Sequence, residues 1–271
     1  MDLSKVKLVV TDMDGTLLNS KGKVSDTFFR IFPQLHKAGI HFVAASGRQF
    51  YSITEKLISI KKNISIIAEN GGMNKFIDQA ISFNVLDTET IKNLIPDLRK
   101  IKDSYIVLCG EKGAYIETDD IHFIDMFKEY YPEYFYIEDL ENIRDEVFFK
   151  IALFHSEDSE KYIYPAVKHL ENKLQVKVSG QCWLDIAHPN ANKGNVLKAL
   201  QEEFGISNEE TMAFGDFNND LEMLNNSYFS FAMENAHPNI KRAARFTTKS
   251  NDEEGVEIIL WDLLKAKRRT K

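Results

Sequence analysis

The stretch Lys7-Leu-Val-Val-Thr-Asp-Met-Asp-Gly-Thr-Leu-Leu18 decides the fold of this chain. Its apolar residues at 8–10 are typical of a buried strand, and Asp12 and Asp14 follow directly, two positions apart. Side chains at positions i and i+2 of an extended chain point to the same face, so the two carboxylates should converge. Converging acids repel each other unless a cation or a proton lies between them. The stretch therefore predicts a functional site at the end of a buried strand.

The turn after the two acids contains residues that suit a sharp exit from a strand. Gly15 permits the tight turn, and the hydroxyl of Thr16 can hold a neighbouring acid in place. The pattern Asp-x-Asp-Gly-Thr alone is a modest signal, because surface turns and calcium loops also use Asp and Gly. Its position directly after an apolar strand favours a site over a surface turn.

The composition is that of a soluble globular protein. The chain has 271 residues, 44% hydrophobic and 28% charged, which suits one large or two medium domains. A net charge of −7 argues mildly against nucleic acid or an anionic membrane as the main partner. Nothing in the composition indicates an oligomeric state.

The cysteines and the hydropathy pattern indicate a compartment. Cys109 and Cys182 lie far apart without metal-ligand spacing, which predicts reduced thiols and neither a disulfide nor a zinc site. The sequence contains no apolar run of membrane length, and from its first residues we expect no targeting segment. We therefore expect a cytoplasmic protein.

Strand and helix patterns alternate over the first part of the chain. After the opening strand, helices are expected near residues 25–39 and 50–61, and strands at 41–45 and 64–68. This alternation predicts right-handed βαβ units and thus an α/β fold with a Rossmann-like, doubly wound parallel sheet. Each strand ends in small, polar or acidic residues, at the sheet edge where sites form.

The pattern changes after the third strand. Short strand-like pieces at 73–83 predict a hairpin, and a mixed block of helices and short strands follows it. The alternating pattern resumes at Lys193. We therefore predict a catalytic core from residues 1–83 and 188–271, with an inserted α+β cap domain from residues 84–187.

Four strand ends supply the residue types of a phosphoryl-transfer site. Carboxylates bind a hard divalent cation such as Mg²⁺, while a lysine, a hydroxyl and backbone N–H groups hold phosphate oxygens. A carboxylate can also act as the nucleophile, because it forms an acyl-phosphate. The residues concerned are Asp12 and Asp14, then Ser46 and Gly47, then Lys193, and finally Asp216, Asn219 and Asp220.

These residues resemble the four motifs of the haloacid-dehalogenase-like phosphatases, in the same order. The motifs are Asp12-Met-Asp14-Gly-Thr16, Ser46-Gly47, Lys193-Gly194 and Gly215-Asp216-Phe-Asn-Asn219-Asp220. The long insertion between the second and third motifs is similar to the cap of the Cof-type, sugar-phosphatase branch. The resemblance covers essentially the whole chain, and it implies the core and cap architecture described above.

The resemblance also implies a role for each motif residue. Asp12 would be the nucleophile and a Mg²⁺ ligand, and Asp14 the general acid and base, with its backbone carbonyl on the metal. Asp216 would be the second carboxylate on Mg²⁺. The phosphoryl group would be held by the amides of Met13 and Gly47, the Ser46 hydroxyl, Lys193 and Asn219, with Thr16 and Asp220 in support.

The expected function is hydrolysis of small phosphorylated metabolites, sugar phosphates in particular, with Mg²⁺ and an aspartyl-phosphate intermediate. Two alternatives stay open: a phosphomannomutase-like phosphosugar mutase, and a non-catalytic protein that binds phosphorylated metabolites. Arg48, next to the second motif, is equally consistent with a substrate contact and with a salt bridge. For Trp183, in the cap, packing is favoured over contact with a sugar.

Overall fold

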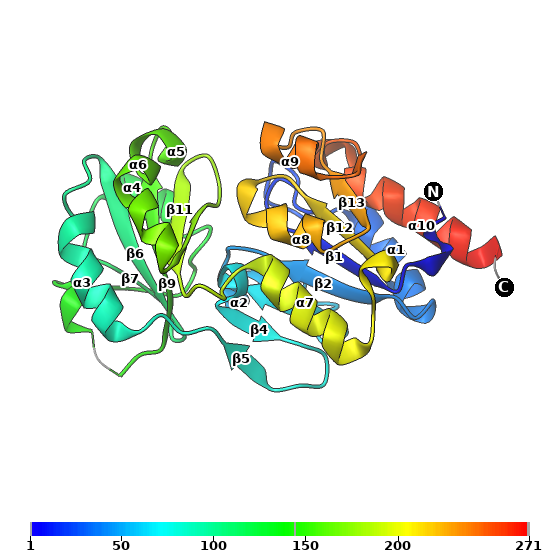
Figure 1. Cartoon of the computed structure of the whole chain (residues 1–271), viewed down its shortest axis with the longest axis horizontal. Helices are drawn as coiled ribbons and strands as arrows, with labels where there is room; N and C mark the ends of the chain where they lie inside the picture. The colour runs from blue at the N-terminus through cyan, green and yellow to red at the C-terminus, as the bar shows by residue number, and fades with distance from the viewer. Residues whose placement is uncertain (1, 144, 270–271) are drawn as a thin grey trace.

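The computed structural model describes residues 2–143 and 145–269, which form two lobes side by side (Figure 1). We call the lobe with the eight-stranded sheet the core lobe and the lobe with the six-stranded sheet the cap lobe. The labelled chain ends in Figure 1 both lie at the end of the core lobe that faces away from the cap lobe.

The core sheet has the strand order β14-β13-β12-β1-β2-β3-β4-β5. Neighbouring strands are parallel from β14 through β3, while β4 and β5 form the predicted antiparallel hairpin. The strands are β1 (Leu8–Asp12), β2 (His41–Ala45), β3 (Ser65–Ala68), β4 (Met73–Lys75), β5 (Ile81–Phe83), β12 (Thr211–Gly215), β13 (Phe229–Ala232) and β14 (Phe246–Thr247).

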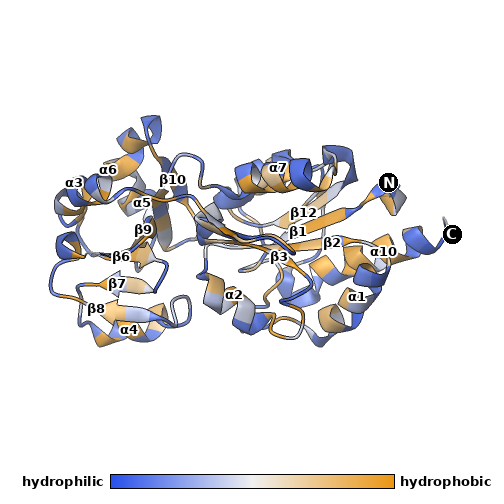
Figure 2. Cartoon of the chain, turned by 90° about the horizontal axis from the view of Figure 1, so that it is seen from below, coloured by the Kyte–Doolittle hydropathy of each residue, from blue (hydrophilic) through white to orange (hydrophobic). Residues whose placement is uncertain are grey.

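Helices cover both faces of the core sheet. Helix α7 lies on one face, and α1, α2 and α10 lie on the other (Figure 2). The helices are α1 (Asp26–Lys37), α2 (Phe50–Lys56), α7 (Lys193–Phe204), α8 (Leu221–Asn225), α9 (Pro238–Ala243) and α10 (Gly255–Arg269), with short 3₁₀ turns that include Glu69–Gly71 and Asn218–Asp220. This arrangement confirms the predicted doubly wound α/β core.

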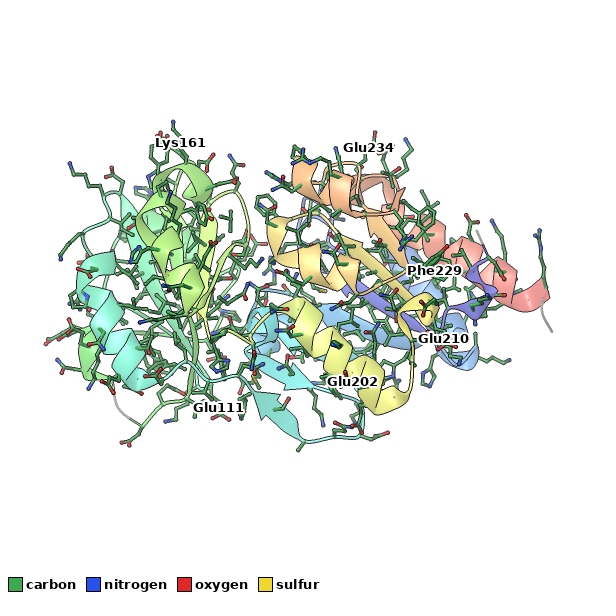
Figure 3. All side chains as sticks on the ribbon, viewed as in Figure 1. Glu111, Lys161, Glu202, Glu210, Phe229 and Glu234 are labelled. Carbon is green, nitrogen blue, oxygen red and sulfur yellow. The ribbon has the colours of Figure 1, made fainter. Side chains whose placement is uncertain are left out.

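Strand β1 lies in the interior of the core sheet, where both of its edges are paired and both of its faces are covered. All five of its residues are buried, and the strand pairs with β2 on one side and β12 on the other. Figure 2 shows the central strands as hydrophobic and the outer faces of the helices as more hydrophilic. The labelled side chain of Lys161 projects outward from the cap lobe in Figure 3.

The cap sheet has the order β10-β11-β9-β6-β7-β8 and is antiparallel except for the parallel pair β7 and β8. Its strands are β6 (Ser104–Gly110), β7 (Ala114–Ile116), β8 (Tyr134–Tyr136), β9 (Phe148–His155), β10 (Gln175–Val178) and β11 (Trp183–Ala187). Its helices are α3 (Thr88–Leu98), α4 (Ile121–Phe127), α5 (Ser159–Tyr162) and α6 (Tyr164–Val167), followed by the 3₁₀ turn Lys168–Asn172.

The chain enters the cap lobe after β5 and returns to the core lobe after β11, so the cap lobe is an insertion in the core. The division at residues 84 and 187 stays a prediction. Among the helices within residues 2–143 and 145–269, none combines the length and the apolar character needed to span a membrane.

Candidate active site

The predicted site residues gather where the carboxyl ends of the core strands face the cap lobe. A cavity of about 570 Å³ lies there, with walls from both lobes. Parallel strands end at the same edge of their sheet, and this brings residues from three separate strand ends into one cavity. The predicted residues that line it are Asp12, Asp14, Ser46, Gly47, Asp216 and Asn219.

Lys193 lies beneath this cavity, at the start of α7. The Asn192 side chain caps the helix by accepting a hydrogen bond from the Asn195 amide. The Lys193 ammonium is fully buried, and its Nζ lies 2.5 Å from Asp12 Oδ1 and 2.7 Å from Asp220 Oδ1. Burial opposes the charge, but the two carboxylates outweigh it and raise the pKa of Lys193. Lys193 therefore remains a cation held between two acids.

The two carboxylate oxygens of Asp12 differ in their hydrogen bonding. Its Oδ1 accepts from Lys193, whereas its buried Oδ2 has no hydrogen-bond partner in the part of the chain that the structure describes. Burial raises the pKa of Asp12 to about 7, against the pull of Lys193. A buried carboxylate oxygen without a partner is costly, so this atom is a candidate for contact with a cation or a substrate.

Asp216 lies next to Asp12 and is held by the turn that follows β1. The Thr16 hydroxyl donates to Asp216 Oδ1 at 3.1 Å, so Thr16 positions an acid as predicted from its side chain. Burial, followed by repulsion from Asp12 and Asp220, raises the pKa of Asp216 well above its ordinary value. Gly15 has a φ of +71°, and a Cβ there would lie 2.2 Å from Asp216 Oδ2. Glycine is therefore required at this close approach.

Asp220 uses both of its carboxylate oxygens within the core lobe. Its Oδ1 accepts from Lys193, and its Oδ2 accepts from the amides of Asp216 at 2.9 Å and Phe217 at 3.3 Å. These contacts close the turn that presents Asp216. The geometry therefore suits the supporting role expected for Asp220.

The acids fit a hard divalent cation. One oxygen from each of Asp12, Asp216 and Asp220 lies within 4.8 Å of the others, and Asp12 Oδ2 is the atom that lacks a partner. Carboxylate oxygens are the donors that Mg²⁺ prefers. Because both oxygens of Asp220 are already used, Asp12 and Asp216 are the better candidates for direct ligands.

Asp14 faces a different cation from Asp12. Arg48 donates from Nε to Asp14 Oδ2 at 2.7 Å and from Nη2 to Asp14 Oδ1 at 2.6 Å. Of the two interpretations that the sequence left open for Arg48, the structure shows the salt bridge. The two acids line one cavity as predicted, but each is held by its own cation.

The remaining predicted residues are spread around the cavity wall. The Ser46 hydroxyl accepts a hydrogen bond from the Arg48 amide at 3.1 Å, and Asn219 donates from Nδ2 to Asn70 Oδ1 at 3.0 Å. Met13 is fully buried, and its carbonyl accepts from the Leu18 amide at 2.7 Å. The assigned phosphate contacts of these residues stay predictions.

The cap lobe contributes an aromatic wall that the sequence reading did not assign to the site. Trp183 lies 5.8 Å from Tyr130 and 5.0 Å from Phe154 between ring centroids, and all three residues line the cavity together with Tyr131. Trp183 both packs in the cap lobe, as favoured above, and borders the cavity. The density of aromatic residues at 123–136 was the available signal.

Lys150 is a second buried lysine that the sequence reading missed. From β9 of the cap lobe, its Nζ donates to the Gly47 carbonyl at 2.7 Å and lies 3.1 Å from Glu69 Oε2 and 3.3 Å from Asp185 Oδ1. Asp185 in turn accepts from Asn70 at 2.5 Å. A single lysine within the apolar segment 147–155 was the available signal, because such a charge needs buried partners.

Comparisons with known proteins show which family the chain belongs to. The family model described as haloacid dehalogenase-like hydrolase matches residues 9–260. The 5-amino-6-(5-phospho-D-ribitylamino)uracil phosphatase YbjI of Escherichia coli is 32% identical, covering 96% of this chain and 97% of its own. YwtE of Bacillus subtilis, with the same phosphatase name, is 29% identical and covers 96% of this chain and 98% of its own.

A solved structure, that of SMU.1108c from Streptococcus mutans, is 32% identical with a TM-score of 0.90, and the match covers 96% of this chain and 99% of that one. The fold, the family model and these relatives point to the same group of enzymes. The chain therefore belongs to the haloacid dehalogenase-like hydrolases, which confirms the predicted family and the predicted class, a phosphoric monoester hydrolase.

Proposed function

We propose that this enzyme is a Mg²⁺-dependent phosphatase that hydrolyses small phosphorylated metabolites, sugar phosphates in particular, through an aspartyl-phosphate on Asp12. The observation that carries the proposal is the arrangement at the cavity floor. Asp12 is held by Lys193, keeps one oxygen without a partner, and shares the cavity with Asp14. A nucleophile and a proton donor are both needed, and these two acids supply them.

In the first step, a carboxylate oxygen of Asp12 attacks phosphorus. The bond from phosphorus to the ester oxygen breaks, and Asp14 gives its proton to the leaving alcohol. In the second step, Asp14 takes a proton from water, the water oxygen attacks phosphorus, and the aspartyl-phosphate bond breaks. Inorganic phosphate leaves, and Asp12 is restored as a carboxylate.

Phosphoryl transfer also needs positioning and neutralisation of charge. We assign these tasks to the Lys193 ammonium, the Ser46 hydroxyl, the Asn219 amide group and the backbone amides of Met13 and Gly47. Mg²⁺ would be held by Asp12, Asp216 and the backbone carbonyl of Asp14, and it would neutralise the negative charge of the phosphoryl group.

The cap wall supports a substrate with an extended organic part beyond the phosphate. Aromatic faces such as those of Tyr130 and Trp183 bury apolar C–H surface, and the cavity of about 570 Å³ accommodates a metabolite-sized group. The two relatives described above are named as phosphatases of 5-amino-6-(5-phospho-D-ribitylamino)uracil, a small molecule with a phosphorylated ribityl chain. We therefore keep sugar phosphates as the proposed substrate class. Cys109 and Cys182 are free thiols, which suits the proposed cytoplasmic location.

The test is release of inorganic phosphate from p-nitrophenyl phosphate and from a panel of sugar phosphates, with Mg²⁺ or with EDTA. Wild-type enzyme should release phosphate only with the metal. Asp12→Asn should lower kcat by at least about 10⁴-fold while the circular dichroism spectrum is unchanged. Near-normal activity of Asp12→Asn would overturn the mechanism, and isomerised sugar phosphate in place of free phosphate would indicate a mutase.

A further inference from the structure

We infer that Arg48 is a positioning residue that couples docking of the cap lobe to the orientation of Asp14. This inference rests on the proposed function, in which Asp14 transfers the proton. Arg48 holds both oxygens of Asp14 with two nitrogens of its guanidinium group, at 2.7 Å and 2.6 Å. A fork of this kind fixes the plane of the carboxylate as well as its distance.

Asp14 depends on this fork for its orientation. Its side chain is 42% exposed, although it lies at the cavity. In the described part of the chain, Arg48 is the residue that hydrogen-bonds to its carboxylate oxygens. An exposed aspartate without such a partner samples several staggered rotamers. A proton donor must instead lie within hydrogen-bond reach of the ester oxygen, so loss of the fork should reduce productive geometry.

The cap lobe holds Arg48 from the other side. The third guanidinium nitrogen, Nη1, donates to the Glu129 backbone carbonyl at 2.6 Å, and Nη2 lies 3.4 Å from Glu129 Oε1. The Tyr130 ring covers the guanidinium, with its centroid 4.5 Å from Cζ. These contacts leave the Arg48 side chain only 2% exposed, even though Asp14 and Glu129 are both open to solvent.

The carbonyl and the ring that cover Arg48 both belong to the segment after α4, in the cap lobe. If the cap lobe moves away, the guanidinium loses these partners and becomes solvated. Docking of the cap lobe therefore places Arg48, and Arg48 places Asp14. The proton donor is aligned when the substrate is enclosed, which ties chemistry to closure of the site.

Leaving groups of different basicity separate this role from a merely structural one. An alkoxide such as that of glycerol phosphate needs a proton as it leaves, whereas dinitrophenolate is stable without one. The quantity to measure is kcat/KM, because it reports the steps up to departure of the leaving group. For Arg48→Met, we expect kcat/KM on glycerol phosphate to fall by about 10²-fold or more, and on dinitrophenyl phosphate by less than about 3-fold. Asp14→Asn should show the same selective loss.

Gln49 offers a matched control. Its side chain also joins the lobes, donating to the Glu133 carbonyl at 3.0 Å and accepting from the Glu133 amide at 3.4 Å, while the hydrogen bonds to the Asp14 carboxylate in the described part of the chain come from Arg48. Gln49→Ala weakens docking but keeps the fork itself, so its loss of kcat/KM should be smaller than that of Arg48→Met, and again larger for glycerol phosphate than for dinitrophenyl phosphate. Arg48→Lys keeps the charge but loses the fork, so its selective loss should lie between those of wild type and Arg48→Met.

The outcomes are distinct. Selective loss with glycerol phosphate in both Arg48 variants supports the inference. An equal loss with both substrates in an otherwise active enzyme overturns it, and shows that Arg48 only stabilises the junction of the lobes. If wild-type enzyme hydrolyses neither substrate with Mg²⁺, the proposed function fails first, and the inference fails with it.

Discussion

Two buried lysines border the site, and they differ in where their partners come from. Lys193 is enclosed by Asp12 and Asp220, which belong to the core lobe. Lys150 comes from the cap lobe and meets Asp185 of its own lobe, but also Glu69 and the carbonyl of Gly47 from the core lobe. In both cases the acids outweigh burial and raise the pKa of the lysine.

This difference shows that the two halves of the site are built in different ways. The half around Lys193 is assembled by the edge of one packed sheet, so it persists whether or not the cap lobe is docked. The half around Lys150 exists when the two lobes meet, because its charges are otherwise exposed to water. The core half therefore suits the proposed chemistry on phosphate, and the junction suits control of access.

The largest expected effect is on activity, through the core half. Lys193→Met leaves Asp12 and Asp220 without their shared cation and removes a proposed phosphate contact. We expect kcat/KM to fall by at least about 10³-fold for every phosphomonoester, whatever its leaving group. Steady-state kinetics on p-nitrophenyl phosphate and glycerol phosphate would measure this, and activity within about tenfold of wild type would contradict it.

The junction should respond chiefly in stability. Lys150→Met leaves the buried acids Glu69 and Asp185 without their cation. Loss of one partner from such a buried charge group lowers the free energy of unfolding by about 3–5 kcal/mol. Urea unfolding followed by circular dichroism measures this loss. The double variant Lys150→Met with Glu69→Gln removes one stranded charge and should recover part of it. Equal stability of the single and double variants would show that the charges are not coupled.

Mg²⁺ should stabilise the core half and leave the junction unaffected. Because the cation relieves repulsion between Asp12 and Asp216, saturating Mg²⁺ should raise the free energy of unfolding by about 2–3 kcal/mol at a hundred times its Kd. Thermal melts with Mg²⁺ and with EDTA would show this as a higher Tm. Lys150→Met should keep the shift, whereas Asp216→Asn should lose most of it.

The smallest effect concerns His41, which lies in the core lobe away from both lysines. Burial lowers the pKa of His41 to about 4, and its Nε2 lies 2.8 Å from Ser65 Oγ. In the unfolded chain, His41 has an ordinary pKa near 6.5, so between about pH 6.5 and pH 4 the unfolded state binds a proton that the folded state does not. The contribution of His41 to the free energy of unfolding is therefore complete above about pH 6.5 and is lost as the pH falls towards 4.

Partial exposure of His41 reduces the size of this effect to about 1–2 kcal/mol. Between about pH 7.5 and pH 5, the free energy of unfolding of the wild type should fall by that much more than that of His41→Asn, which has no titratable group at position 41. Urea titrations at a series of pH values give the difference. Parallel pH curves for the two proteins would mean that His41 is protonated equally in both states.

The core lobe could be predicted from the sequence because its signals are local. The apolar run before Asp12 and the small or acidic residues after each strand indicate a parallel sheet with a site at its edge. Asp220 was also accessible, since it accepts from amides within its own helix start, whereas the Thr16 hydroxyl reaches Asp216 across 200 positions.

The junction could not be predicted, because it depends on pairs from different lobes. The sequence left Arg48 open between two roles, and Glu129, the cap-lobe residue whose carbonyl accepts from its guanidinium, lies 81 positions away. The Lys150 ammonium donates to the carbonyl of Gly47, which lies 103 positions away in the sequence. Within the mixed block predicted for the cap, residues 159–172 form no single helix but α5, α6 and a 3₁₀ turn, with Pro165 near the start of α6.

The central position of β1 has a consequence for synthesis of the chain. Leu8 of β1 pairs with Thr211 of β12, so the middle of the core sheet joins segments made at opposite ends of translation. The cap lobe emerges from the ribosome in between, and we expect it to fold as a unit while β1 still has one bare edge. Pairing over such a separation is slow, and a bare central edge invites association with other chains. An unfinished chain therefore carries Asp12 without its lysine and its principal strand with one edge unpaired, which makes the last third of synthesis the period of greatest risk.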